Sequence, residues 1–378
     1  MTKNALLLLA SILSVAFAFA VPSRAQAVLP MGTVEHVSEP HACTAGQGWD
    51  THMSCVDAAL TDCPGIQDMP FTYGYEKDPQ AGNAGTIVLL SGWGGTAPTS
   101  GTADLQFAED YYNRGYEVVM LAWKWDWELT SNPIPHGTFG NIQAAACRPA
   151  TFLNYVYNNP DLYASGPDTG ICAQGNSAGS AAVAYALTWY GAGDYLDNVE
   201  LLNGPVFSRI DQGCEVPVAP DVSMCPEGQP GCVGWPLPTL QLTPEYIDGY
   251  EGGPRKWTGI PACAGNASTA PYNSVWNAMS IVSDSSTREQ FSYPRTSMAG
   301  WVCATTKAGV AMNNSGSQGE LYYQQINDIR QNYSVNAIYN CPAAEGVSAG
   351  GAVTETGQSG FSAIESDSFA NCRRKPRR

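Results

Sequence analysis

Short apolar runs alternate with stretches of helical periodicity along most of the chain. The runs contain few polar positions, as buried parallel strands do. The stretches between them repeat apolar residues every three or four positions and stop at Gly115, Asn158 or Gly191, which predicts helices. The expected strands are residues 85–93, 116–125, 169–174, 198–203, 298–306 and 334–339, and the expected helices are residues 103–114, 144–157, 180–190 and 319–329. This alternation predicts an α/β fold with a doubly wound, mostly parallel sheet.

Three segments lack this pattern. Residues from about 28 to 70 hold three cysteines and many small residues, which predicts an irregular arm. Residues from about 212 to 294 are rich in Pro, Gly, Trp and Cys, and so long an unpatterned insertion is typical of a cap or lid. The basic residues from about 373 to 378 fit a disordered, solvated tail. The whole of residues 28–378 suits one domain with an inserted cap better than two domains.

The chain begins with the pattern of a secretory leader. Lys3 precedes an apolar run over residues 5–21, and Ala25-Gln26-Ala27 supplies a small-x-small cleavage site. No later run approaches the roughly 20 apolar residues that a membrane helix requires. We therefore expect a signal peptide over residues 1–27 and a secreted or periplasmic product without stable membrane insertion.

The charge and the cysteine content limit which partners and which crosslinks the chain is expected to have. The formal net charge of −16 argues against nucleic acid or an anionic membrane as a partner. All 12 cysteines lie beyond the leader, and an even number in an exported chain favours disulfides. Cys225 and Cys232 could close a small loop. With four histidines and no Cys-x-x-Cys pair, we expect neither a metal site nor a cofactor.

The sequence Gly-Asn-Ser-Ala-Gly, residues 175–179, stands between an expected strand and an alanine-rich expected helix. Gly-x-Ser-x-Gly in this place is typical of a tight turn that exposes a serine nucleophile, because only small neighbours let the backbone fold so sharply. The pattern predicts Ser177 as the nucleophile of an acyl transfer. The alternative is a serine that merely caps the helix.

Acyl transfer also needs hydrogen-bond donors for the oxyanion. The residue after such a serine, here Ala178, supplies one backbone N–H, and a loop after an earlier strand supplies another. Gly-Trp-Gly-Gly, residues 92–95, occupies that loop, so Trp93 or Gly94 is the expected second donor. The alternative is a plain glycine turn.

Several short sequences together resemble a known group of proteins. They are Ala-Ala-Cys-Arg-Pro-Ala-Thr at 145–151, Cys-Ala-Gln-Gly-Asn-Ser-Ala-Gly at 172–179, Tyr-Ala-Leu with Tyr-Gly within 185–191, Asn-Gly-Pro at 203–205 and Gly-Cys at 213–214. This set is similar to uncharacterised bacterial secreted α/β hydrolases, and the likeness is densest between residues 85 and 214. The resemblance implies an α/β-hydrolase-type fold with a disulfide-rich cap, and an esterase- or lipase-like activity on a small-molecule ester.

The residues expected to activate the serine differ from those of that group. A base must activate the serine, and in this fold the order along the chain is Ser, then Asp or Glu, then His. The four histidines, His36, His41, His52 and His136, all precede Ser177. In similar proteins a histidine is expected in the loop after the last strand.

Other residues stand at the expected positions of base and acid. Glu345 occupies the place of the histidine, and Ala308 stands about where the acid is expected, after the strand 298–306. Asp211 and the more distant Asp284 are candidate displaced acids, although each fits an ordinary surface carboxylate better.

Three hypotheses follow. In the first, the protein is a degenerate hydrolase scaffold that binds a ligand or partner. In the second, His136 is a relocated base, because its loop follows the strand 116–125 and opens at the same edge of the sheet. In the third, Glu345 is the base, in acidic surroundings or with a raised pKa. Ester hydrolysis and the binding scaffold remain the two candidate functions.

Two further features have a structural and a functional interpretation. Trp123, Trp125 and Trp127 could stack on a sugar or an aryl ester, but packing of the cap is the favoured interpretation. Arg148 could hold a ligand carboxylate or phosphate, but a structural pair with Asp or Glu is favoured.

Overall fold

The computed structural model describes residues 28–44, 47–50, 52–77, 82–92, 94–99, 101–132, 141–163, 166–210, 273–304, 319, 322–326, 333–339, 341, 352–354 and 356–373. The predicted leader, residues 212–272 of the predicted cap with Cys225 and Cys232, and residues 374–378 of the tail lie outside this part of the chain.

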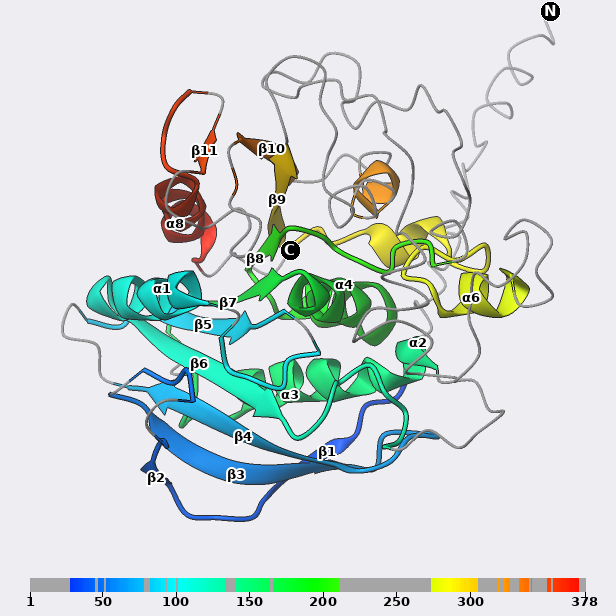
Figure 1. Cartoon of the computed structure of the whole chain (residues 1–378), viewed down its shortest axis with the longest axis horizontal. Helices are drawn as coiled ribbons and strands as arrows, with labels where there is room; N and C mark the ends of the chain where they lie inside the picture. Colours follow the sequence, from blue (N-terminus) through cyan, green and yellow to red (C-terminus); the bar gives the residue numbers. More distant parts are fainter. Residues whose placement is uncertain are drawn as a thin grey trace, which may run out of the picture.

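The described residues form one sheet of eleven strands (Figure 1). The strands are β1 Thr33–His36, β2 His41–Ala42, β3 Ser54–Thr61, β4 Met69–Glu76, β5 Gly85–Leu90, β6 Tyr116–Trp123, β7 Gly170–Asn176, β8 Asn198–Leu202, β9 Ser297–Ala304, β10 Tyr333–Tyr339 and β11 Val353–Thr354. Their order is β1-β3-β4-β6-β5-β7-β8-β9-β10-β11, with β2 also paired to β3. The strands from β6 to β10 in this order run parallel, and those at both edges are antiparallel.

Helices cover both faces of the sheet (Figure 1). α1 Thr102–Asn113 and α8 Gly360–Asn371 pack on one face, and α3 Cys147–Asn158, which follows the short α2 Ile142–Ala145, packs with α4 Ala178–Tyr190 on the other. None of the helices in the described part of the chain has the length and apolarity to cross a membrane.

Alternate residues of the central strands enter two separate cores. Ile87 and Leu89 of β5 pack with α1 and α8, whereas Val88 and Leu90 pack with α3 and α4. A strand covered on both faces reads as an unbroken apolar run, which is why the pattern predicted it. The strand order, the parallel centre and the helices on both faces confirm the expected α/β fold of the hydrolase type.

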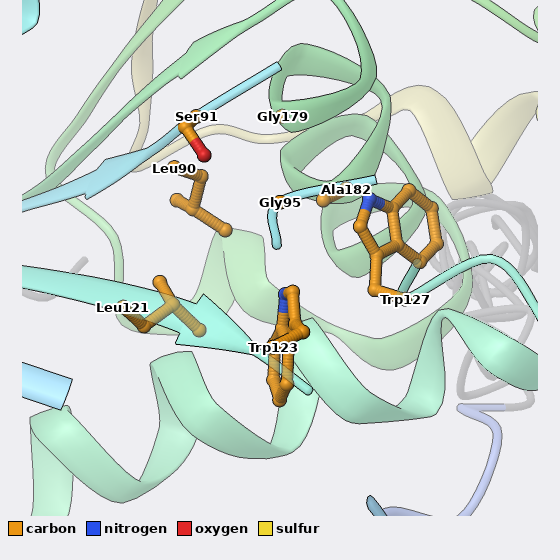
Figure 2. Close-up of a pocket in the computed structure, with 8 residues that line it drawn as sticks. All are labelled: Leu90, Ser91, Gly95, Leu121, Trp123, Trp127, Gly179 and Ala182. Atoms are coloured by element: carbon orange, nitrogen blue, oxygen red, sulfur yellow. The ribbon is translucent and has the colours of Figure 1, made fainter. Parts of the chain in front are cut away.

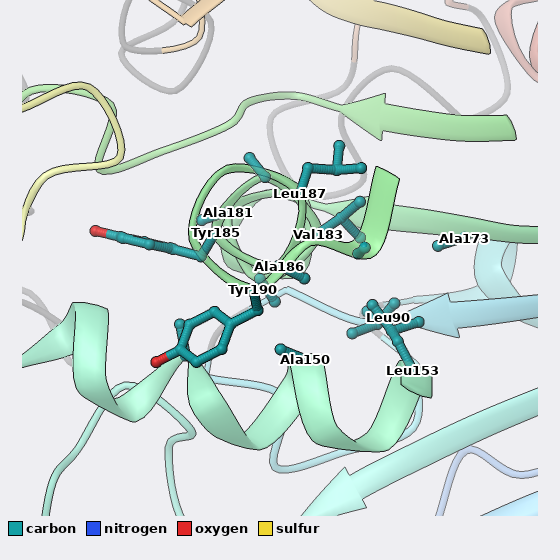
Figure 3. Packing of buried hydrophobic residues seen from close by; sticks show 14 of the residues in the cluster. Leu90, Ala150, Leu153, Ala173, Ala181, Val183, Tyr185, Ala186, Leu187 and Tyr190 are labelled. Atoms are coloured by element: carbon teal, nitrogen blue, oxygen red, sulfur yellow. The ribbon is translucent and has the colours of Figure 1, made fainter. Parts of the chain in front are cut away.

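The helix after the Gly-Asn-Ser-Ala-Gly turn lies wholly inside the protein. All of its residues are buried, and many are alanines that let neighbouring helices approach closely. Figure 3 shows Ala150 of α3 next to Ala186 and Tyr190 of α4, and Leu153 of α3 next to Leu90 of β5. Because α4 is enclosed on every side, the turn at its start is held in one position.

The structure differs from the sequence prediction in two segments, the N-terminal arm and the last part of the cap. The arm over residues 28–70 is not irregular, because it contains β1, β2, β3 and the start of β4. The last part of the predicted cap contains α6 Asn273–Met279 and the 3-10 helix η5 Arg288–Phe291. These pack on α4, where Tyr185 Oη donates to Met279 O at 2.6 Å and Trp189 Nε1 to Ile281 O at 3.2 Å.

A C-terminal helix was also not predicted. α8 packs its Phe361 and Ile364 into the core beside α1. It ends at Cys372, which forms a disulfide with Cys172 of β7. This bond joins residues 200 positions apart, and crosslinks over long separations restrict the unfolded chain most.

The expectation of disulfides is confirmed for the described cysteines. Each of them is paired, in the bonds Cys43–Cys55, Cys63–Cys147, Cys172–Cys372 and Cys303–Cys341. Two bonds bear on the site described below, because Cys63–Cys147 holds the start of α3 and Cys303–Cys341 joins the ends of β9 and β10.

Buried carboxyl groups in the sheet favour their protonated form. Burial, the Asp50 carboxyl hydrogen-bonded to it and the nearby Glu109 raise the pKa of Glu76 from 4.5 to about 8. Burial and the Asp367 carboxyl raise the pKa of Glu200 well above its ordinary range, although Glu200 also accepts hydrogen bonds from Asn198 and Trp301. Both groups therefore carry a proton that the unfolded chain releases at lower pH.

We expect the protein to be more stable in acid than at mildly alkaline pH. A raised pKa contributes stability below the unfolded value near 4.5, and that contribution is lost as the pH rises toward about 8. Glu365 adds to the effect, because burial and Asp110 raise its pKa to about 8 against the opposing charge of Arg114. Thermal unfolding should show a melting temperature lower by about 3 °C or more at about pH 8 than at about pH 5. Glu76→Gln should reduce this difference, and a flat or rising profile would contradict the assignment.

Candidate active site

The strand order places two loops at one point of the sheet. From β5 the chain leaves toward α1 on one face, and from β7 it leaves toward α4 on the other. In open α/β sheets, ligands bind in the crevice outside the carboxyl ends of the strands at such a reversal. The loop of Gly92–Gly95 follows β5 and Ser177 follows β7, so the two predicted features meet there.

Ser177 adopts a strained backbone conformation at this point. Its φ of 52° and ψ of −112° lie where residues with a Cβ rarely go. Its N–H donates to Leu202 O of β8 at 2.8 Å, and its carbonyl accepts from Ala181 N in α4 at 3.1 Å. Within the described residues, the side chain makes no capping hydrogen bond to α4, and the residue is partly exposed. The geometry is that of a serine presented by a strand-to-helix turn, and the helix-cap alternative does not fit it.

Two glycines make the turn possible. A Cβ on Gly175 would lie 2.3 Å from Gly179 O, so the two limbs of the turn touch through their main chains. A Cβ on Gly179 would lie 2.1 Å from Leu90 O and 2.7 Å from Ser91 O, at the carboxyl end of β5. The first turn of α4 therefore lies directly against the start of the loop after β5.

That loop is held by hydrogen bonds along its main chain. Gly94 and Gly95 have φ of 68° and 69°. Gly95 N–H donates to Gly92 O at 3.0 Å and is therefore engaged within the loop. The N–H groups of Trp93 and Gly94 remain the candidate donors to an oxyanion beside that of Ala178, as the sequence predicted. Trp93 itself lies outside the described residues.

The carbonyls of the same loop are bound by the segment after β6. Trp123 N–H donates to Gly95 O at 2.8 Å, and Trp127 N–H donates to Gly94 O at 2.9 Å. A Cβ on Gly94 would lie 2.6 Å from the Asp126 side chain, so the loop and this segment are in close contact.

Two of the three tryptophans pack in the core. Trp123 and Trp127 are almost fully buried, with Trp127 against Tyr185 at 6.3 Å between ring centres. Figure 2 shows both rings around a small cavity that Gly95 and Gly179 also line. The cavity has about 10 Å³, the space of one water molecule. The burial of Trp123 and Trp127 agrees with a packing role, but they pack in the core with α3 and α4 and not in the cap that the sequence analysis expected.

Arg148 makes its hydrogen bonds to the main chain and not to the Asp or Glu side chain that the sequence favoured, although the carboxylates of Glu128 and Asp68 act on it through their charge. It is fully buried at the start of α3, and its guanidinium donates to main-chain carbonyls: Nη1 to Trp127 O at 3.0 Å and to Leu129 O, and Nη2 to Gln67 O at 2.6 Å and to Thr130 O at 3.4 Å. Sequence reasoning missed this arrangement, whose only signal was a lone cation at the start of an otherwise apolar helix.

The predicted base and acid residues stay predictions. His136, Asp211 and Glu345 lie outside the described residues. Asp284 is an exposed carboxylate paired with Arg209 at 3.3 Å, as the surface interpretation expected. Within the described residues, no group of three His, Cys, Asp or Glu side chains could hold a metal ion.

A disulfide joins the ends of the two strands after which the sequence predicts the acid and the base. β9 ends at Ala304 and β10 at Tyr339, and Cys303 is bonded to Cys341 between these ends. The segments containing Ala308 and Glu345 therefore start from one crosslinked point at the carboxyl edge of the sheet.

A groove is lined in part by residues 96–98, which follow the glycine loop after β5. It has a volume of about 360 Å³ and is lined by uncharged residues: Gln47, Trp49, Thr72, Thr96, Ala97, Pro98 and Ala122. This volume is in the range of small-molecule sites, and the uncharged lining suits a neutral ligand.

No family model and no curated protein matches the sequence. Among solved structures, the chain is similar to acetyl xylan esterase 1 from Thermoanaerobacterium sp., with 12% identity, 82% of this chain and 81% of that chain covered, and a TM-score of 0.47. It is also similar to a bacterial brefeldin A esterase, with 13% identity, 79% and 71% covered, and a TM-score of 0.42. A thermostable carboxyl esterase from Bacillus coagulans matches with 12% identity, 76% and 90% covered, and a TM-score of 0.42. Likeness at this level says nothing about activity, so the function rests on the site itself.

We expect Gly179→Ala to destabilise the protein strongly. The new Cβ would lie 2.1 Å from Leu90 O, and a backbone clash cannot be relieved by rotating a side chain. Urea denaturation should show a loss of about 3 kcal/mol of unfolding free energy. Gly166→Ala is the matched control: its Cβ would meet only the Thr169 side chain at 3.3 Å, and we expect a loss below about 1 kcal/mol. Equal stability of the two variants would show that α4 does not approach β5 this closely.

Proposed function

We propose that the protein is a secreted serine hydrolase that cleaves carboxylic esters, with Ser177 as the nucleophile. The observation that supports this most directly is the strained Ser177 at the strand-to-helix turn, adjoining the glycine loop after β5. Backbone strain in a partly exposed residue costs free energy, and such strain clusters at catalytic sites. The proposed organisation is a leader over residues 1–27 and a single domain over 28–378, with a cap over about 212–294.

The reaction proceeds through an acyl-enzyme. Ser177 Oγ attacks the ester carbonyl carbon while its proton passes to the base, and the oxyanion receives hydrogen bonds from the Ala178 N–H and from Trp93 or Gly94. The tetrahedral intermediate collapses, and the alcohol leaves with the proton returned by the base. Water then attacks the acyl group by the same route and frees Ser177.

We propose Glu345 as the base and His136 as its alternative. Glu345 follows β10 in the chain, and the Cys303–Cys341 bond joins the ends of β9 and β10. A carboxylate base suits acidic surroundings, and the buried carboxyls Glu76 and Glu200 favour stability at acidic pH. Asp211 is the candidate acid. The alternative function, a scaffold that binds a ligand without turnover, is favoured by one observation, the lack of any histidine after Ser177.

Purified protein should hydrolyse short neutral acyl esters, and Ser177→Ala should abolish this activity. Esters that carry a carboxylate should react more slowly, because the chain has a net charge of −16 and the groove beside the loop is uncharged. Release of p-nitrophenol from acetyl and butyryl esters measures the rate, and covalent labelling by a fluorophosphonate tests Ser177 directly. If wild type and Ser177→Ala are equally inert and unlabelled between about pH 4 and pH 8, the protein is a binding scaffold.

The pH dependence of kcat/KM should identify the base. With Glu345 as the base, the rate should rise with a midpoint near the ordinary glutamate pKa of about 4.3, whereas with His136 the midpoint should lie near about 6.5. Glu345→Gln should lower kcat by about a hundredfold or more, with His136→Gln as the matched control at wild-type rate. The reverse pattern would assign the base to His136.

A further inference from the structure

Arg148 lies at the centre of a ring of carbonyl groups. Its guanidinium bonds the carbonyls of Trp127, Leu129 and Thr130 after β6, and that of Gln67 before β4. Burial lowers the pKa of Arg148 to about 10, and the carboxylates of Glu128 and Asp68 oppose this effect, so the group stays charged at neutral pH. A buried charge is retained only where it is well bonded, which these carbonyls provide.

The bonded carbonyls belong to a segment without regular structure. Residues 124–132 form turns between β6 and the predicted position of His136, so their carbonyls have no strand partner. A planar guanidinium with several N–H groups can bond two chain segments at once. Arg148 adds its hydrogen bonds to the one that already joins the two segments, from Gln67 N–H to Thr130 O at 2.8 Å.

One residue connects this ring to the candidate oxyanion loop. Trp127 accepts from Arg148 through its carbonyl and donates through its N–H to Gly94 O at 2.9 Å. Its buried ring lines the small cavity next to Gly95 (Figure 2). The position of Trp127 therefore fixes the position of Gly94.

We propose that Arg148 is a positioning residue for the oxyanion loop. It touches neither Ser177 nor a substrate, and it acts by holding Trp127, which holds Gly94. The catalytic part of this inference rests on the proposed ester hydrolysis; the mechanical part, that Arg148 orders the loop, does not.

The mechanical part is tested by amide hydrogen exchange in Arg148→Lys. Lysine keeps the charge but presents all its donors at one atom, so it cannot bond both segments. The Gly95 and Trp127 amides should exchange at least about tenfold faster than in wild type. Arg148→Met serves as a second variant wherever it folds, with the same expectation.

The matched control is Arg295→Lys. Arg295 is also largely buried and bonds the Asp197 carboxylate at 3.0 Å and the Asp194 carbonyl at 3.3 Å. It precedes β9, at the edge of the sheet opposite the turn of Ser177. Exchange at Gly95 and Trp127 should be unchanged in this variant. Unchanged exchange in folded Arg148→Lys, or an equal increase in Arg295→Lys, would overturn the inference.

The catalytic part is tested by kinetics on a neutral ester. Misplaced oxyanion donors weaken the transition state more than substrate binding, so Arg148→Lys should lower kcat by about tenfold to a hundredfold and leave KM within about twofold. The midpoint of the pH profile should not move, because the base is unaffected. A raised KM at wild-type kcat would overturn the positioning role. If wild type itself shows no Ser177-dependent turnover, the proposed function fails, while hydrogen exchange still decides the inference.

Discussion

The main-chain contact between the start of α4 and the end of β5 is the constraint on which the site depends. Gly179 lies so close to Leu90 that no side chain fits between them. In the proposed hydrolase, this contact puts the N-terminal amide groups of the helix and the glycine loop at one point before a substrate binds. Donors set in place in advance need no reorganisation during the reaction, and for this reason they stabilise an oxyanion effectively.

The chain uses its buried charges in two opposite ways. Arg148 remains charged because main-chain carbonyls surround it, whereas Glu76 and Glu200 are neutralised by protons and by neighbouring carboxyls. With 18 basic residues against 34 acidic ones, buried carboxyls have few cations to pair with. A protein of this composition is therefore most stable at a pH low enough to keep these buried carboxyls protonated.

The sequence predicted the features that local patterns encode. The central strands, α1, α3 and α4 were expected close to their observed bounds, because strands buried on both faces and an alanine-rich helix leave strong periodic signals. The turn at Ser177 was expected because so sharp a turn requires residues without a side chain, and the sequence shows glycines at 175 and 179.

The features that it missed depend on distant contacts. β3 gains its stability by pairing with β4. α8 has three serines among its twelve residues and therefore weak helix propensity, and it depends on burial and on the Cys172–Cys372 bond. Arg148 donates to carbonyls up to 81 positions away. Every residue has a main-chain carbonyl, so the spacing of side chains in the sequence cannot indicate which carbonyls it binds.

The last described residue is held at one end of β7, and the candidate nucleophile lies at the other end. Arg373 pairs with Thr169, just before β7 begins, whereas Ser177 stands just after β7 ends. At about 3.3 Å per residue, the strand between them spans on the order of 20 Å. A purification tag, a surface anchor or a fused module joined to the C-terminus would thus leave from the rim of the sheet opposite the crevice, and the molecule could be immobilised with its site facing outward.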